Sequence, residues 1–257
     1  MCALLLPLTG CGGDADSADV GGPDTPSWAA TGVSGTVTVL AAASLTEAFG
    51  RLGETFETQN PDADVRFSFA ASSELATQIT QGAPADVFAS ASPSTMHQVV
   101  DADGTSGDPK VFVRNRLEIA VPSGNPAGVT WLADFARDPL KIALCAPEVP
   151  CGAAADTAFA AAGVTPRPDT LEADVKATLS KVTLGEVDAA LVYRSDVKAA
   201  GSDVEGIDFP ESDEAINDYP IAKLAGGPNP SGAEAFVELV LSDQGLAVLT
   251  EAGFERP

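Results

Sequence analysis

The chain has 257 residues, of which 45% are apolar and 20% charged, a composition typical of a folded protein with one large or two ordinary domains. Its formal net charge is -23, from 37 acidic and 14 basic residues. Because the sequence contains no cluster of Lys or Arg, nucleic acid and anionic membrane surfaces are disfavoured as partners. An acidic protein repels anions at long range, so any anion site must use short-range, oriented donors.

The first residues are typical of a secreted lipoprotein. Residues 3–8 form a short apolar run, which suits the core of a signal peptide but cannot span a bilayer. The run ends in Leu-Thr-Gly-Cys, which resembles the bacterial lipobox and predicts that Cys11 is lipidated. The basic segment that usually opens a signal peptide is missing, which leaves open a translation start further upstream. A chance cysteine beside an apolar segment is the alternative.

A stretch rich in Gly, Asp, Ser and Pro follows Cys11 and predicts a flexible tether. We therefore expect a signal peptide over residues 1–10 and a lipidated cysteine with its tether over residues 11–35. The protein is then extracytoplasmic and anchored to the cell membrane by its acyl chains alone.

From about residue 35 onward, short β-branched runs alternate with longer amphipathic runs rich in Ala and Leu. Strands are predicted at 37–40, 65–69, 87–89, 117–121, 141–144, 189–192 and 221–224. Helices are predicted at 45–58, 74–81, from Pro93 onward, 153–162, 175–184, 232–241 and 243–251. This alternation indicates βαβ units, an α/β fold and mostly parallel sheets. No long linker divides the folded part, so two lobes would have to exchange strands.

Four segments share a pattern in which a strand ends, a small or hydroxyl residue follows, and a helix begins. They are residues 41–47, 69–75, 150–153 and 173–176. A helix start has unpaired backbone N–H groups and a partial positive charge, so several starts facing one cleft form an anion site without Lys or Arg. Ser44 and Ser72 could add hydroxyl donors, although each serine alone is more typical of an N-cap. Tyr193, at the end of a buried strand, is by itself more typical of a core tyrosine.

Five motifs, taken together, resemble the periplasmic molybdate-binding protein family of ABC transporters, in the order of that family. They are Ala-Ala-Ala-Ser-Leu-Thr at 41–46, Phe-Ala-Ala-Ser-Ser-Glu-Leu-Ala at 69–76, Gly-Ala-Pro-Ala-Asp-Val-Phe at 82–88, Pro-Glu-Val-Pro-Cys-Gly at 147–152 and Leu-Val-Tyr-Arg-Ser-Asp at 191–196. The resemblance extends over about residues 37–254. It implies the type II periplasmic-binding-protein fold, in which two crossover strands join two α/β lobes, here residues 36–116 with 221–257, and residues 117–220.

The resemblance also implies a ligand, molybdate or tungstate, and the groups that hold it. These groups are the hydroxyls of Ser44 and Ser72, backbone amides near Cys151 and Val175, and the phenol of Tyr193. The segment at 147–152 is a residue shorter than in well-known members and has Cys151 where they have alanine, but the role needs only the amide. The resemblance implies a monomer that docks on an ABC permease, and we expect no cofactor and no ligands for a metal cation.

Cys145 and Cys151 lie close together in the sequence, and an extracytoplasmic location permits a disulfide between them. Two free thiols are the alternative. Zinc is disfavoured, because two cysteines and the single, distant His97 cannot supply four ligands.

An enzyme on the same fold is disfavoured, because the chain has no Gly-x-Ser-x-Gly elbow and no Walker-type phosphate loop. His97 is expected on a solvated helix face, and Asp86 is expected to cap or pair locally; Asp174 is the other acid or base candidate. A binding protein for sulfate, phosphate or a carboxylate remains an alternative. A carboxylate binder would use an arginine fork, for which Arg194 is the candidate. We expect the lobes to close on the ligand about residues 115–117 and 218–221.

Overall fold

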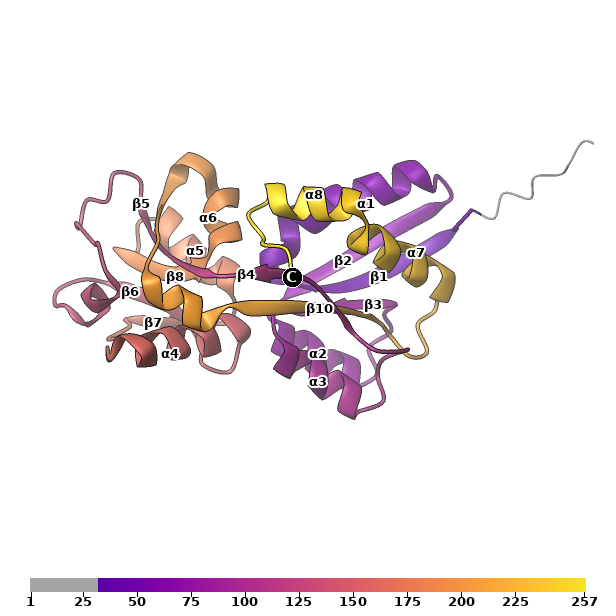
Figure 1. Ribbon diagram of the computed structural model, residues 1–257, viewed down its shortest axis with the longest axis horizontal. Coiled ribbons are helices and arrows are strands. Elements are labelled where there is room, and N and C mark those ends of the chain that lie inside the picture. Colours follow the sequence, from indigo (N-terminus) through magenta and orange to yellow (C-terminus); the bar gives the residue numbers. More distant parts are fainter. Residues whose placement is uncertain (1–31) are drawn as a thin grey trace, which may run out of the picture. The chain divides into compact units, whose positions relative to one another are not determined.

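Residues 32–257 are described by the computed structural model, and they form two α/β lobes, each built on a five-stranded sheet (Figure 1). Cys11, the predicted signal peptide and most of the predicted tether lie outside the described residues. Within residues 32–257, no helix has the length and apolar character needed to cross a membrane.

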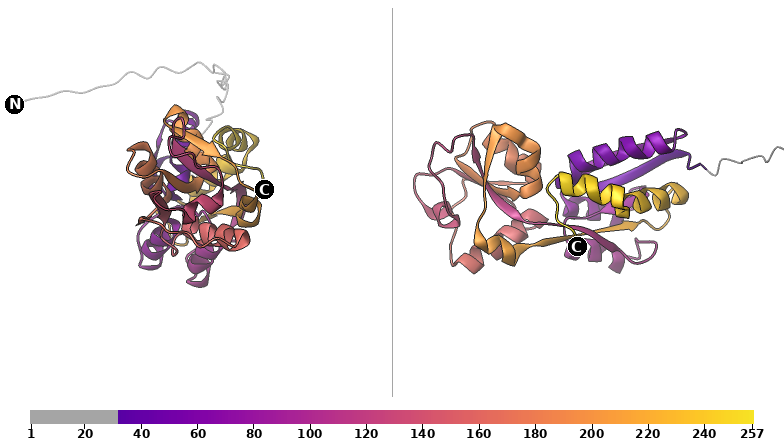
Figure 2. Two further views of the ribbon diagram at one scale, coloured as in Figure 1. Left: turned by 90° about the vertical axis from the view of Figure 1, so that its left-hand side faces the viewer. Right: turned by 45° about the horizontal axis from the view of Figure 1, so that its top comes forward.

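The sheet of the first lobe has the strand order β2-β1-β3-β10-β4. Its strands are β1 (Gly35–Ala42), β2 (Ala63–Ala70), β3 (Val87–Ala89), β4 (Lys110–Asn115) and β10 (Asn217–Lys223). Its helices are α1 (Thr46–Gln59), α2 (Ser72–Thr80), α3 (Pro93–Asp101), α7 (Pro230–Leu241) and α8 (Asp243–Glu251). Helices α1, α7 and α8 cover one face, and α2 and α3 cover the other (Figures 1 and 2). Each face therefore has its own apolar core, the larger one containing Phe49, Phe56, Phe112 and Phe236.

The sheet of the second lobe has the strand order β7-β6-β8-β5-β9. Its strands are β5 (Leu117–Pro122), β6 (Ile142–Cys145), β7 (Thr170–Glu172), β8 (Ala189–Tyr193) and β9 (Val204–Ile207). Its helices are α4 (Pro150–Ala162), α5 (Val175–Thr183) and α6 (Arg194–Ala200). All five residues of β8 are buried, because this strand lies in the middle of the sheet.

The chain passes from the first sheet to the second between β4 and β5, with only Arg116 between them, and it returns through β10. This arrangement confirms the predicted fold class of two α/β lobes joined by two crossover strands. The prediction of mostly parallel sheets is wrong in detail. Strand β10 is antiparallel to β3 and β4, and β5 is antiparallel to β8 and β9. Since β5 and β10 enter their sheets from the other lobe, they run against their neighbours, and both sheets are mixed.

Three strands and one α-helix were not predicted from the sequence, namely β4, β7, β9 and α6. Strands β7 and β9 have only three and four residues and form the two edges of their sheet. Helix α6 has seven residues, which is too short for a periodic apolar pattern.

Candidate functional site

The five residues predicted to hold the ligand all line one small cavity between the lobes, with a volume of about 20 Å³. Ser44 and Ser72 belong to the first lobe, and Cys151, Val175 and Tyr193 belong to the second. The other lining residues are mostly small or apolar: Ala42, Ala43, Ala70, Ala71, Ala91, Val149, Pro150 and Asp174. The structure therefore brings together segments that are far apart in the sequence.

Four helix starts meet at this cavity, as the repeated pattern predicts. A 3-10 turn at Ala43–Leu45 precedes α1, and α2, α4 and α5 begin at or next to the other lining residues. The backbone amides of Ser44, Ser72, Cys151 and Val175 form no hydrogen bond with any described residue. All four residues are buried, and buried amides are nearly always paired. Four unpaired donors in one cavity are therefore suited to an anion.

Three hydroxyl groups lie at the same place. Ser72 Oγ accepts a hydrogen bond from the Ala91 amide at 2.9 Å, and Ser44 Oγ lies 2.9 Å from the hydroxyl of Tyr219. The Tyr193 hydroxyl accepts from Asn217 Nδ2 at 3.0 Å. Neither serine caps its helix through its side chain, so the N-cap interpretation is wrong for both.

Tyr193 is protonated at every physiological pH, which makes its hydroxyl a donor. The side chain is buried in the core of the second lobe, and this burial raises the pKa of the phenol well above its usual value. A protonated phenol whose oxygen already accepts from Asn217 is suited to donate to an anionic ligand.

An ion pair crosses between the lobes beside the cavity. Lys176 Nζ of α5 lies 2.8 Å from Glu47 Oε2 of α1 and 3.2 Å from Asp196 Oδ1 of α6. Burial lowers the pKa of Lys176, but Asp196 and Glu47 together outweigh it and the net direction is upward. Asp196 is buried, and burial raises the pKa of its carboxyl to about 6 despite the opposing effect of Lys176. Asp196 Oδ1 has no hydrogen-bond partner among the described residues, so Lys176 compensates its charge only through the ion pair.

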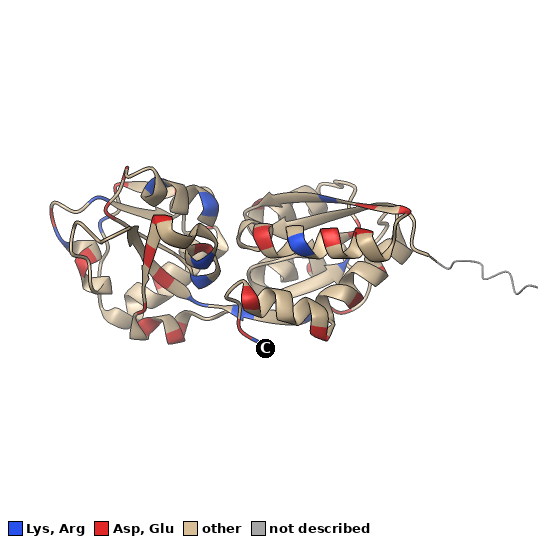
Figure 3. Cartoon of the chain, turned by 90° about the horizontal axis from the view of Figure 1, so that it is seen from above, with Lys and Arg blue, Asp and Glu red and all other residues tan. Residues whose placement is uncertain are grey.

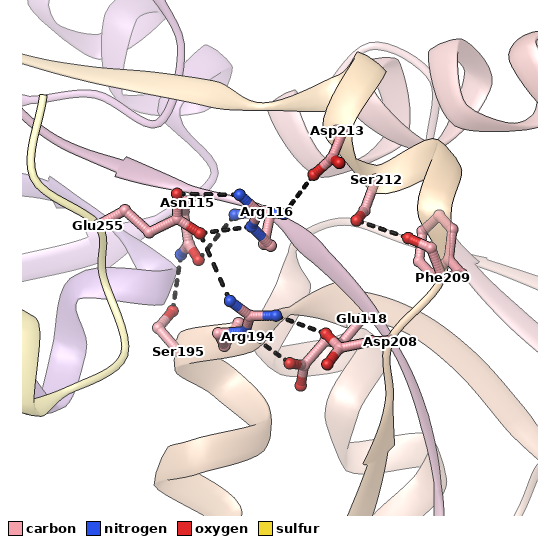
Figure 4. A network of polar contacts seen from close by, with 10 residues as sticks. All are labelled: Asn115, Arg116, Glu118, Arg194, Ser195, Asp208, Phe209, Ser212, Asp213 and Glu255. Atoms are coloured by element: carbon pink, nitrogen blue, oxygen red, sulfur yellow. Dashed lines mark hydrogen bonds and ion pairs between the residues drawn. The ribbon is translucent and has the colours of Figure 1, made fainter.

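Arg194 is not one of the residues that line the cavity, and it is bound by carboxylates near the crossover (Figure 4). Its Nε donates to Glu118 at 2.7 Å, and its other nitrogens contact Asp208 and Glu255. Arg116, in the first crossover, contacts Glu255 as well. Arg194 is therefore engaged already, and the described residues lining the cavity include no Lys or Arg that could form a fork.

Cys145 and Cys151 are joined by a disulfide, which lies between β6 and the second residue of α4. The Cys145 sulfur also lies 3.3 Å from Thr178 Oγ1 of α5. The next residue of α4 is Gly152, where a Cβ atom would lie 1.9 Å from the Ala146 carbonyl oxygen. Only glycine allows the first turn of α4 to pack this closely against the loop that the disulfide closes.

The acid or base candidates have structural roles. Asp86 accepts hydrogen bonds from the amides of Thr38 and Asn229, which are distant in sequence rather than local as predicted. Asp174 lines the cavity, but its carboxylate caps α5 by accepting from two amides of the first turn. His97 lies on an exposed helix face, as predicted. In the part of the chain that the structure describes, no group of His, Cys, Asp or Glu could hold a metal ion.

Sequence reasoning missed the polar residues behind the cavity, namely Asn115, Asp196, Asn217 and Tyr219. Asn115 ends β4 and Asn217 begins β10, so both lie on crossover strands. Asp196 belongs to the Leu-Val-Tyr-Arg-Ser-Asp motif that the sequence already singles out, and this was a signal that could have found it.

A cavity of oriented donors between two lobes joined by crossover strands defines a protein that encloses a small anion. Residues 37–255 match the model of a family described as bacterial extracellular solute-binding proteins, and the chain belongs to this family. The family confirms the prediction of an extracytoplasmic binding protein rather than an enzyme.

Comparison with individual proteins gives the same class. The chain is 39% identical over 254 residues to the molybdate-binding protein ModA of Mycobacterium tuberculosis, covering 99% of this chain and 95% of the relative. Its fold is similar to that of the periplasmic molybdate-binding protein of Azotobacter vinelandii, with a TM-score of 0.77, 18% identity, and coverage of 86% of this chain and 99% of that one. It is also similar to that of the sulfate-binding protein SubI of M. tuberculosis, with a TM-score of 0.74, 17% identity and 86% of each chain covered. The fold alone therefore does not decide between oxyanions.

Proposed function

We propose that this protein binds molybdate, or the closely similar tungstate, between its lobes and delivers the anion to the membrane permease of an ABC importer. The observation that carries the proposal is the set of donors in one cavity. The residues that line it include four with unpaired amides, two from each lobe, and three with hydroxyl groups, and no cationic side chain among the described residues lines it. The name of the mycobacterial relative, which is similar over nearly the whole chain, supports molybdate as the ligand.

A lining made of donors favours a fully deprotonated oxyanion. Hydrogen phosphate would turn its own proton toward a donor, which leaves a costly unpaired contact. Sulfate has shorter bonds than molybdate, and we expect it to bridge the donors of the two lobes less well. A carboxylate would need an arginine fork, and Arg194 is bound by Glu118 and Asp208. The acidic positions spread over both lobes, visible in Figure 3, make short-range donors the necessary means of holding an anion.

Binding proceeds by closure of the lobes. In an open form the four helix starts are accessible, the anion bridges them, and closure about residues 115–117 and 218–221 excludes water. Exclusion of water strengthens each hydrogen bond to the oxyanion. Lipidation of Cys11 would hold the monomeric protein at the outer surface of the cell membrane, next to its permease.

Thermal melts with four anions test the proposed ligand. A ligand that binds only the folded state raises its stability by about 2.7 kcal/mol at a hundredfold excess over Kd. Molybdate and tungstate at millimolar concentration should each raise Tm by several degrees, sulfate far less, and phosphate least. Added sodium chloride should weaken binding only modestly, because buried donors are poorly screened. Equal shifts for all four anions, or a shift with phosphate alone, would reject molybdate as the ligand.

Removal of single hydroxyls tests the location of the site. A hydrogen bond to a charged group contributes roughly 1.5–3 kcal/mol, so Tyr193→Phe and Ser72→Ala should each weaken molybdate binding about 10- to 100-fold in calorimetry. Ser231→Ala is the matched control, since it removes a hydroxyl from the first turn of α7, and Ser231 is not among the residues that line the cavity. An unchanged Kd in both site variants would place the ligand elsewhere.

A further inference from the structure

The hydrogen bond between Asn217 and Tyr193 has a fixed direction. Asn217 Nδ2 lies 2.6 Å from the carbonyl oxygen of Ala91 and 3.0 Å from the Tyr193 hydroxyl. A carbonyl oxygen only accepts hydrogen bonds, so the contact with Ala91 requires the nitrogen of the Asn217 amide to face it. The same nitrogen then donates to Tyr193, and the phenol oxygen is an acceptor in this contact.

Tyr193 has a single proton, and Asn217 leaves it free. Since the amide nitrogen cannot accept, the phenol must direct its proton to another group. The neighbouring hydroxyl of Tyr219 interacts with that of Tyr193, but it is also engaged by Ser44 Oγ at 2.9 Å and by Asn115 Nδ2 at 3.5 Å. Tyr193 lines the cavity, so an anion bound there can take this proton in place of Tyr219.

The peptide unit of Ala91 links this hydroxyl to a second one. The Ala91 carbonyl accepts from Asn217, and the Ala91 amide donates to Ser72 Oγ at 2.9 Å. The Ser72 oxygen is thereby engaged as an acceptor, like that of Tyr193. One short chain of hydrogen bonds, from the second lobe through Asn217 on the crossover strand to the first lobe, therefore engages both hydroxyl oxygens as acceptors.

We infer that Asn217 is a positioning residue that fixes the hydroxyl of Tyr193 as a hydrogen-bond donor to the anion. The inference rests on the proposed function and extends it, because it names the residue that gives the cavity its donor character. Asn217 itself does not line the cavity. Asn217 acts by orienting the hydroxyl proton of Tyr193.

A double-mutant cycle tests the inference. Calorimetry would give the Kd of wild type, Asn217→Ala, Tyr193→Phe and the double variant for sodium molybdate, or for whichever anion of the panel raises Tm most. Asn217→Ala removes the hydrogen bond that orients Tyr193, together with the one to Ala91, and should weaken binding about 3- to 10-fold. In the Tyr193→Phe background the same change should weaken binding less than about twofold, because the hydroxyl that it orients is gone. An equal loss in both backgrounds means a merely structural role and overturns the inference.

An isosteric variant provides an independent check. Asn217→Asp replaces the donor with an acceptor, which can take the Tyr193 proton and faces the Ala91 carbonyl unfavourably. Its affinity should fall more than that of Asn217→Ala, and a smaller loss would contradict the inference. Melts without ligand verify that each variant folds, and if Asn217→Ala does not, the comparison uses Asn217→Asp.

The control variant is Asn229→Ala, which removes a cap of α7 in the first lobe and should lower Tm with little change in Kd. If no anion of the panel binds wild type, the proposed function fails and the inference falls with it. If wild type binds but the Asn217→Ala loss persists without the Tyr193 hydroxyl, only the inference fails.

Discussion

The ion pair between Lys176 and Glu47 connects α5 of the second lobe with α1 of the first, so it exists only while the lobes meet. Both oxygens of Glu47 contact Lys176 Nζ, at 2.9 and 2.8 Å. Glu47→Gln removes this contact and leaves Lys176 beside the buried Asp196. It is therefore a cleaner change than a substitution of Lys176, which would leave a buried carboxylate without its cation.

The size of the expected effect on binding follows from the exposure of the two side chains to solvent. The side chain of Glu47 is 50% exposed and that of Lys176 25% exposed, so water and salt screen much of their attraction. Exposed and half-exposed pairs contribute roughly 0.2–1 kcal/mol, which corresponds to at most about a fivefold change in an equilibrium constant. Because the pair stabilises the closed arrangement, Glu47→Gln should raise the Kd for molybdate about two- to fivefold, mainly through faster release.

Stopped-flow release and calorimetry measure these quantities directly. Glu186→Gln is a matched control, because Lys181 and Glu186 form a similar pair at 2.8 Å within the second lobe. The difference between the two variants should shrink as salt increases. If Glu47→Gln leaves Kd and the release rate unchanged, or if Glu186→Gln alters them equally, the pair does not hold the lobes together.

Three further predictions concern other parts of the chain. Cys11→Ser should move the protein from the membrane fraction to the soluble fraction, and an unmodified Cys11 in mass spectra of wild type from its host would contradict lipidation. Peptide mapping without reductant should find Cys145 and Cys151 linked, a loop closure that adds roughly 2 kcal/mol, whereas two free thiols would disprove it. Because burial raises the pKa of Asp196 to about 6, the folded state binds a proton that the unfolded chain releases near pH 4. Its contribution to the free energy of unfolding therefore decreases as the pH rises from about 4 to about 6, and Asp196→Asn should remove up to roughly 3 kcal/mol of this pH dependence. If the Tm of the wild type and that of the variant changed with pH in parallel, the prediction would be refuted.

Much of the fold could be predicted because the central strands are buried on both faces and read as continuous apolar runs. Strand β8 and strand β3 are of this kind. Strand β4 escaped prediction because only Phe112, Val113 and Asn115 of it are buried, between charged positions. The edge strands β7 and β9 owe their conformation to partners elsewhere in the chain, which a local pattern cannot reveal.

The cavity lining could be predicted because each of its contributions is local: a strand end, a small residue and a helix start. The residues behind it follow no such pattern. Asn217 and Tyr219 acquire their partners only when the crossover strand returns between the lobes, and Ser44 lies 175 positions from Tyr219 in the sequence. Interactions of this range depend on the three-dimensional arrangement of the lobes and have no signature in a single sequence.

The two tyrosines of the chain give it a built-in spectroscopic reporter. Tyr193 lines the cavity and Tyr219 contacts Ser44 directly behind it, with the two rings 6.0 Å apart. Trp131, by contrast, is 61% exposed and outside the cavity lining. A sample labelled with ¹³C only at tyrosine would thus give two sets of resonances, both from the site. A ligand that touches the cavity wall must perturb the Tyr193 signal, while the Tyr219 signal follows rearrangement one layer deeper, so occupancy and reorganisation could be followed separately without any attached dye.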